Sequence, residues 1–281
     1  MMYAPADQFV PLATAAEDAG FDQVSLSDHV FYPADLASKY PYTPDGSPSF
    51  QPATPWPDVW VTMGAMGAVT SRLSFVTHVY VLPARNPFVV AKAVATASFL
   101  SGGRVVLGAG AGWMREEFEQ LEQPYKQRGR RMEEMIEVLR TLWQGGDVEH
   151  HGHFYDFGPL SMSPAPPAPI PILIGGHSDI ALRRAATVGD GWMGVYYELD
   201  VLEGYLKRLH ELLDEAGRSS EPFEITTSVL ALPTKDVCER LEEMGVTTLL
   251  TSAWLMEGID NGTLEQNVDA LNRFGDTYIH P

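Results

Sequence analysis

Short apolar runs alternate with longer segments of helical periodicity along the whole chain. Repeated strand-then-helix units indicate parallel strands joined by right-handed crossovers. Apolar residues at helical spacing predict helices over 7–19, 58–69, 87–100, 114–122, 129–143, 180–188, 201–216, 235–244 and 264–274. Runs rich in β-branched residues predict strands over 23–27, 73–82, 104–109, 171–174, 191–195, 224–230 and 246–251.

About seven such units favour an α/β protein with the (β/α)8 TIM-barrel fold over an open sheet. The number of strands is one short, because only residues 1–5 are available for a strand ahead of the first helix. We therefore expect one TIM-barrel domain over residues 1–281, with insertion loops and a first strand that is short or missing. A length of 281 residues is normal for one such barrel.

Two stretches follow neither period. Residues 31–57 are rich in Pro, Tyr, Ser and Asp and come directly after a strand, so we expect a long loop on the catalytic face, acting as a lid or a substrate wall. Residues 148–169 begin with His and aromatic residues and continue with several prolines, which predicts a short hairpin and then a stiff extended connector.

Charge and cysteine content narrow the classes of function. The formal net charge of −18 argues against nucleic-acid partners and against binding to anionic membranes, since both need a positive field. A single cysteine, Cys238, excludes an internal disulfide framework and a Cys-rich zinc site. Because nothing resembles a signal peptide or a membrane-spanning run, we expect a cytoplasmic enzyme that acts on a small molecule.

The first candidate for chemistry is His29, at the carboxyl end of the strand 23–27. Strand side chains alternate between faces, so Val24 and Leu26 would pack outward while Ser25, Ser27 and His29 face the barrel axis. Barrel enzymes keep their reacting groups at this end, and an imidazole can move one proton per turnover. A buried histidine with a structural role is the alternative. His78 and Tyr80, on the apolar strand 73–82, are more typical of core packing.

Two glycine-containing turns could meet a ligand. The run from Gly108 to Trp113 lacks the dinucleotide-binding spacing, but Gly110 and Gly112 permit close approach of a flat ligand or of another backbone, and Trp113 offers a stacking face. A tight strand-to-helix turn explains the same residues. The second turn, Gly175, Gly176, His177 and Ser178, precedes a helix and favours an anion site that Arg183 and Arg184 could reinforce, with a simple N-cap as the alternative.

Two other clusters of charged or metal-ligating side chains are weaker candidates for a functional site. His150, His151 and His153 have poor spacing for a metal site, so we expect no metal there. The basic residues around Arg128 favour a solvated helix start or, less readily, contact with a polyanionic ligand tail.

Taken in order, these motifs resemble the bacterial luciferase-like superfamily and, more narrowly, the coenzyme F420-dependent oxidoreductases of actinobacteria. The resemblance is carried by Ser27-Asp28-His29-Val30, by the segment 81–87, by the segment 108–113, and by Ile174-Gly175-Gly176 together with Gly189-Asp190-Gly191-Trp192. It spans about residues 7–192 and is specific as an ordered set, although each motif alone is weak.

The resemblance implies a deazaflavin or flavin in the carboxyl-end mouth of the barrel, on a non-proline cis-peptide bulge at Thr77, His78 and Val79. It places Asp28 and His29 at the reacting face, with His29 moving the proton, and it implies cofactor contacts from Gly110, Gly112 and Trp113. Gly175, Gly176, His177 and Ser178 would hold its phosphate. Some members that oxidise sugar phosphates have a glutamate where Trp113 stands, so the match does not support that substrate.

The leading hypothesis is an F420-dependent oxidoreductase that transfers a hydride between the deazaflavin and a small organic substrate. The alternatives are an FMN-dependent luciferase-like monooxygenase and a non-catalytic flavin-binding protein. Members of the superfamily often dimerise, so the resemblance also implies a homodimer.

Overall fold

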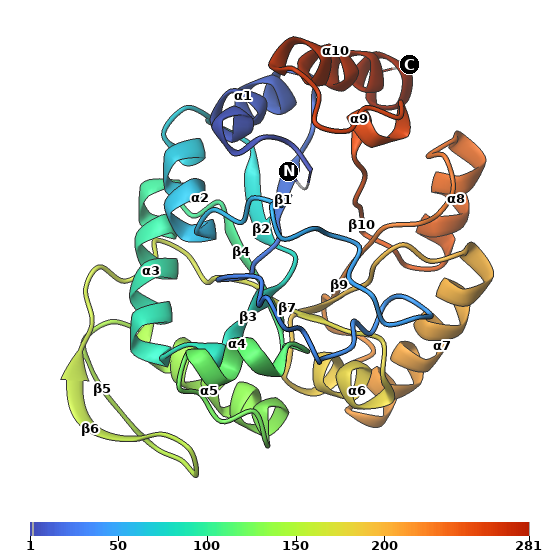
Figure 1. Cartoon of the computed structure of the whole chain (residues 1–281). Coiled ribbons are helices and arrows are strands. Elements are labelled where there is room, and N and C mark those ends of the chain that lie inside the picture. Colours follow the sequence, from blue (N-terminus) through green and yellow to red (C-terminus); the bar gives the residue numbers. More distant parts are fainter. Residues whose placement is uncertain (2, 281) are drawn as a thin grey trace.

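Parallel strands form the centre of the molecule, and helices surround them (Figure 1). The structure is a computed structural model that describes residues 1 and 3–280. The strands pair in the order β1 (Gln23–Leu26), β2 (Ser74–Thr77), β4 (Val105–Gly110), β7 (Ile172–Gly175), β8 (Gly191–Met193), β9 (Glu224–Thr227) and β10 (Thr248–Leu249). All these pairs are parallel, and β3 (Tyr80–Val81) also joins β4.

The helices begin where the sequence supplies capping groups. Asp58 accepts hydrogen bonds at the start of α2, Asn86 does so before Pro87 at α3, and Thr263 forms a capping box with Gln266 at α10. The α-helices are α1 (Phe9–Asp18), α2 (Val59–Gly67), α3 (Pro87–Leu100), α4 (Arg115–Gln120), α5 (Arg128–Leu142), α6 (Asp179–Val188), α7 (Leu199–Glu215), α8 (Lys235–Glu243), α9 (Ala253–Met256) and α10 (Leu264–Phe274). Short 3-10 helices span Ala6–Gln8 and Leu82–Ala84, and a π-helix spans Gly275–Ile279.

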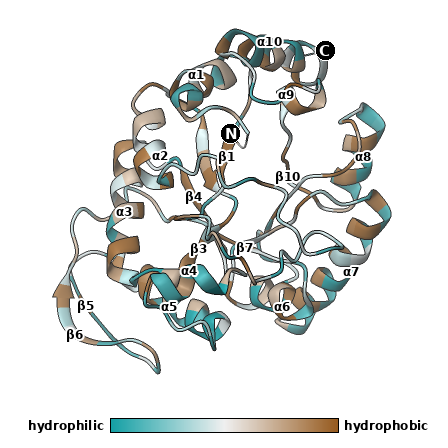
Figure 2. Cartoon of the chain, viewed as in Figure 1, coloured by the Kyte–Doolittle hydropathy of each residue, from teal (hydrophilic) through white to brown (hydrophobic). Residues whose placement is uncertain are grey.

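The core lies between the sheet and these helices. Figure 2 shows hydrophobic colour on the central strands and mixed colour on the outer helices, as an inward-facing apolar stripe requires. Leu12, Met63, Leu107 and Ile136 are each fully buried in this layer. No helix among residues 1 and 3–280 is long and apolar enough to cross a membrane.

The α/β barrel-type fold is confirmed, and so is the missing first strand: none of the described residues ahead of α1 belongs to a strand. As a result β1 and β10 pair on one side only, and the sheet stays open between them. The strand expected over 73–82 is also interrupted: β2 ends at Thr77, β3 begins at Tyr80, and the His78–Val79 peptide between them is cis. The cis peptide expected from the family resemblance is thus present.

The two irregular stretches lie where the sequence placed them. Residues 31–57 form no helix or strand and cross in front of the carboxyl ends of the strands (Figure 1). β5 (Asp147–His151) and β6 (Asp156–Ser161) form an antiparallel hairpin that projects away from the barrel beside α3 and α5.

Candidate active site

His29 lies just beyond the carboxyl end of β1 and is held by a buried carboxylate. Its Nδ1 is 3.2 Å from Oε2 of Glu117, a residue that is 1% exposed. The other oxygen, Oε1, accepts the backbone N–H of Val30 at 2.7 Å. An ionised carboxylate can only accept, so neutral His29 carries its proton on Nδ1. Nε2, which has no partner within the described chain, is then the nitrogen free to exchange a proton.

Sequence reasoning missed Glu117, which stands in the first turn of α4. It is 88 residues from His29 along the chain, so no local pattern joins them. The available signal was positional: α4 follows the glycine-rich end of β4, and the first turn of a helix that follows a barrel strand lies beside the mouth.

Asp28 is turned into the protein and ties two segments together. Its Oδ1 accepts from the Arg85 guanidinium at 2.8 Å, and its Oδ2 accepts the Val81 N–H at 3.0 Å. Burial raises the pKa of Asp28, while the Arg85 guanidinium and the Val81 N–H act in the opposite direction. This pairing fixes the end of β1 against the turn that follows β3.

Thr77, His78 and Val79 form the bulge at the end of β2. Thr77 is fully buried, and its hydroxyl donates to the Gly108 carbonyl at 2.8 Å. His78 Nε2 lies 3.2 Å from the Gly194 carbonyl oxygen, and burial lowers the pKa of His78 to about 4. His78 is therefore neutral near pH 7, with Nε2 as the donor. Val79 is half-buried.

The glycines of the two turns make room for protein side chains. A Cβ on Gly110 would lie 2.4 Å from Val79 Cγ2, and a Cβ on Gly175 would lie 2.6 Å from Val79 Cγ1. Gly112 has a φ of 78°, and a Cβ there would lie 2.6 Å from a Val81 methyl. Close approach is thus the reason for these glycines, and the approaching groups are Val79 and Val81. Val79 forms a half-buried platform between Gly110 and Gly175.

Aromatic rings surround the imidazole of His29. Its ring centroid is 5.2 Å from Phe50, 5.5 Å from Trp56 and 5.9 Å from Trp113. Phe50 and Trp56 belong to the 31–57 loop, and Phe50 is only 4% exposed, so the loop covers the mouth in this conformation. The indole N–H of Trp56 is buried without a hydrogen-bond partner, which leaves one donor beside His29 for an incoming oxygen.

At the second turn, Ser178 caps α6: its Oγ accepts the Ala181 N–H at 3.3 Å. The N-cap alternative therefore holds for Ser178, while Gly176, at a φ of 117°, turns the chain ahead of it. His177 lies between Tyr42 and Tyr205, at centroid distances of 5.1 and 5.6 Å, and burial lowers its pKa.

The two arginines expected to reinforce this turn are occupied elsewhere. Arg183 pairs with Glu215 at 3.0 Å, and Arg184 pairs with Glu133 at 2.8 Å. An anion at the turn would therefore rely on backbone amides. Among the described residues no group of three or more His, Cys, Asp or Glu side chains could hold a metal ion, and His150 lies instead 3.5 Å from Glu134.

Comparison with known proteins identifies the family to which this chain belongs. The family model described as luciferase-like monooxygenase matches residues 2–278. An uncharacterised protein of Mycobacterium tuberculosis (strain ATCC 25618 / H37Rv) is 42% identical over 273 residues, which cover 96% of this chain and 94% of that protein.

Two further matches carry functional names. The F420-dependent glucose-6-phosphate dehydrogenase of Nakamurella multipartita is 34% identical over 79% of this chain and 63% of its own length. The crystal structure of the monooxygenase RslO1 from Streptomyces bottropensis superposes with a TM-score of 0.74 at 20% identity, covering 98% of this chain and 92% of that one. At that identity the similarity shows the fold alone.

Proposed function

Because the chain belongs to the luciferase-like monooxygenase family, we propose that it is an F420-dependent oxidoreductase that moves a hydride between the deazaflavin and a small organic substrate. The observation that carries the proposal is the His29–Glu117 pair, which leaves one imidazole nitrogen free at the barrel mouth. The relative named as an F420-dependent dehydrogenase supports the choice of cofactor.

The residues at the mouth fit a flat redox cofactor. Val79, with a glycine on each side, would carry the ring system, and the amides of Gly176, His177 and Ser178 would bind the phosphate. Bound there, coenzyme F420 would supply or accept the hydride, which is chemistry that no side chain offers. The partnerless indole N–H of Trp56 would donate to a substrate or cofactor oxygen beside His29.

The protein itself would handle the proton and exclude water. Nε2 of His29 would accept a proton from a substrate hydroxyl during oxidation, or return one during reduction. The buried carboxylate of Glu117 would stabilise the imidazolium so formed. Phe50 of the 31–57 loop packs against the His29 ring and covers it. The loop would therefore have to open to admit the ligands, and it would then close over them.

Titration of the purified protein with coenzyme F420 tests the proposal directly. We expect saturable quenching of F420 fluorescence at micromolar cofactor, and weaker binding of FMN measured in parallel. Binding of FMN alone would overturn the F420 proposal.

Replacing His29 with alanine tests the proton step. We expect His29→Ala to retain the fold and F420 binding while turnover falls by about two to four orders of magnitude. The matched control is His151→Ala, on the exposed hairpin strand β5, which should keep the wild-type rate. An unchanged rate in His29→Ala would remove His29 from the mechanism.

A second candidate function is an FMN-dependent monooxygenase. The family to which the chain belongs is described as luciferase-like monooxygenase, which supports this alternative. Oxygen consumption with reduced FMN, coupled to substrate oxygenation, would establish this activity in place of F420-dependent hydride transfer.

A further inference from the structure

Phe50 is the only buried residue of the 31–57 loop, with 4% of its surface exposed. Its ring centroid lies 5.2 Å from that of His29. Edge-to-face contacts surround the rest of the ring, with centroid distances of 5.2 Å to Trp56, 6.0 Å to Tyr40 and 6.5 Å to Trp113. We call the rings of His29, Tyr40, Trp56 and Trp113 the cage. A phenyl ring thus fills the cage, directly against the imidazole that would exchange the proton.

The cage offers no cation to an anionic ligand, because it contains neither lysine nor arginine. Arg85, which contacts the same strand end, is paired with Asp28 at 2.8 Å. Arg115 and Arg128 lie against the ring of Tyr125, at 5.0 and 3.9 Å from its centroid. A phosphate or carboxylate inside the cage would therefore be buried without a paired charge, which is costly.

One hydrogen-bond donor of the cage lacks a partner. The indole N–H of Trp56 is buried and makes no hydrogen bond to residues 1 and 3–280. The centroids of the Trp56 and His29 rings are 5.5 Å apart, which is close enough for one ligand oxygen to meet both the indole N–H and Nε2 of the imidazole. Buried donors are normally hydrogen-bonded, so the cage suits a ring that carries an oxygen.

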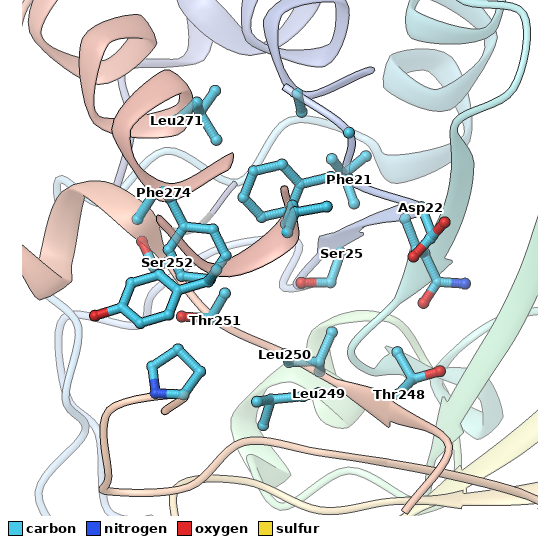
Figure 3. Close-up of a pocket in the computed structure, with 18 of the residues that line it drawn as sticks. Phe21, Asp22, Ser25, Thr248, Leu249, Leu250, Thr251, Ser252, Leu271 and Phe274 are labelled. Carbon is cyan, nitrogen blue, oxygen red and sulfur yellow. The ribbon is translucent and has the colours of Figure 1, made fainter. Parts of the chain in front are cut away.

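The cavity at the opening between β1 and β10 is a separate feature. Figure 3 shows its lining, which includes Phe21, Leu249 and Phe274 and none of the cage residues. A closed barrel has one further strand at this place, so the cavity is no part of a substrate site.

We propose that Phe50 occupies the place of the substrate, and that the substrate is an uncharged molecule with a flat ring and an adjoining secondary alcohol or ketone. The inference rests on the proposed function and names the substrate class of that same site. In oxidation the substrate loses a hydride from its carbinol carbon to the deazaflavin and a proton from its hydroxyl to Nε2 of His29, so the carbon–oxygen single bond becomes a double bond. The indole N–H of Trp56 donates to that oxygen, and Phe50 leaves the cage when the ring enters.

Calorimetric titration with acetophenone, a flat aryl ketone without charge, tests occupation of the cage. We expect saturable binding of acetophenone and no binding of glucose 6-phosphate. Phe50→Ala should bind acetophenone about tenfold more tightly, because no side chain then competes for the cage. The matched control is Phe88→Ala, which removes a ring that packs on Phe157 of the hairpin at 5.1 Å and should keep the wild-type affinity.

Trp56→Phe tests the donor and keeps a ring in the cage, so it also serves if Phe50→Ala fails to fold. We expect this variant to bind acetophenone about three- to tenfold more weakly, because one hydrogen bond is lost. Ethylbenzene, which has the same ring without the oxygen, should bind both proteins equally. Equal weakening of the two ligands would show that Trp56 serves only the shape of the cage.

Each titration is run with and without oxidised F420, whose fluorescence quenching is recorded in the same samples. Failure of acetophenone to bind in either state, or tighter binding of glucose 6-phosphate, would overturn the substrate class even where F420 binds. Binding of acetophenone without any quenching of F420 would support the cage as a ligand site and contradict the proposed cofactor. The two proposals therefore fail on different measurements.

Discussion

At the scale of single residues, the pairing of His29 with Glu117 has the clearest consequence. A carboxylate on Nδ1 fixes one imidazole tautomer and aims Nε2 at the mouth, as outer partners of functional histidines commonly do. Glu117→Gln replaces one of the two carboxylate oxygens with an NH2 group, which cannot accept a hydrogen bond. One of the two bonds, to His29 Nδ1 or to the Val30 N–H, is then lost, so we expect turnover to fall by about 10–100-fold. Nitrogen-15 NMR of the imidazole should show a mixed tautomer in place of the Nδ1–H form.

Glu116 provides the matched control for Glu117. It is the neighbouring carboxylate on the same helical turn. It accepts hydrogen bonds from the backbone N–H groups of Ala37 and Ser38 in the loop, and it makes no hydrogen bond to His29. Glu116→Gln should retain the wild-type His29 tautomer, whatever it does to loop closure. If Glu117→Gln loses activity while its tautomer stays fixed, Glu117 serves the fold and does not position His29.

The same residues show how far sequence can predict a site. The position of His29 at a strand end followed from alternation along 23–27, and Gly110 was expected to permit close approach, whereas Gly175 was expected only as part of an anion-binding turn. The Val79 side chain, which approaches both glycines, and the Glu117 carboxylate, which holds His29, make contacts between segments that are separate in sequence. One-dimensional patterns record which face a residue takes but do not record its partner on another segment.

At the scale of elements, Glu17 joins the end of α1 to the start of β2. Its carboxylate accepts the backbone N–H groups of Ser71, Arg72 and Leu73. The Leu73 N–H is the largest cause that lowers the pKa of Glu17, from an ordinary 4.5 to about 2, and those of Arg72 and Ser71 add to it. A carboxyl whose pKa is lower in the folded chain stabilises the fold above its ordinary pKa, and that stabilisation disappears as the pH falls toward 2.

We therefore expect Glu17→Gln to lower the melting temperature at pH 7 by about 2–4 °C, equivalent to roughly 1 kcal/mol for bonds in a partly exposed site. The difference from wild type should shrink below pH 4.5 and vanish near pH 2. Thermal melts across this pH range provide the measurement. Asp18→Asn, the exposed neighbour, is the control, and an equal loss in both variants would show that charge alone is responsible.

Element boundaries show where periodicity fails. The strands expected over 224–230 and 246–251 end early, at Thr227 and Leu249. Apolar residues continue beyond the last paired residue of each strand, because the loops of a barrel also bury side chains. An apolar run in the sequence does not distinguish a buried loop residue from a residue that is paired in the sheet. The missing first strand could be anticipated, because counting strands needs only the pattern, whereas the opening between β1 and β10 depends on how the remaining strands are arranged.

At the scale of the whole molecule, the net charge of −18 would affect the association rate of the proposed cofactor, F420, which is itself an anion. A net negative field repels a polyanion at long range, so association should speed up as salt screens the repulsion. We expect the association rate of F420 to rise between about 0.01 and 0.15 M salt, measured by stopped-flow fluorescence. A rate that falls with salt would instead indicate a local positive site that outweighs the overall charge.

We propose that a second copy of the chain binds the outer face of α2 and α3. Val61 of α2 is 74% exposed, and Phe99 and Leu100 of α3 are 58 and 60% exposed. Leu100 lies beside Gly64 of α2, where the two helices pack together. An exposed apolar patch of this kind is typical of an association surface, and a self-complementary patch closes as a twofold dimer. We therefore expect a homodimer in solution, and light scattering after gel filtration should give twice the mass of 30.9 kDa.

Phe99→Glu places a charge on this surface and should convert the dimer to a monomer, because an unpaired carboxylate is costly to bury at an interface. Val201→Glu, on α7, makes the same change at a residue that is 50% exposed and should leave the dimer intact. Dissociation by both variants would point to a general effect of added negative charge on a chain that is already strongly acidic. A dimer that survives Phe99→Glu would place the interface on another face.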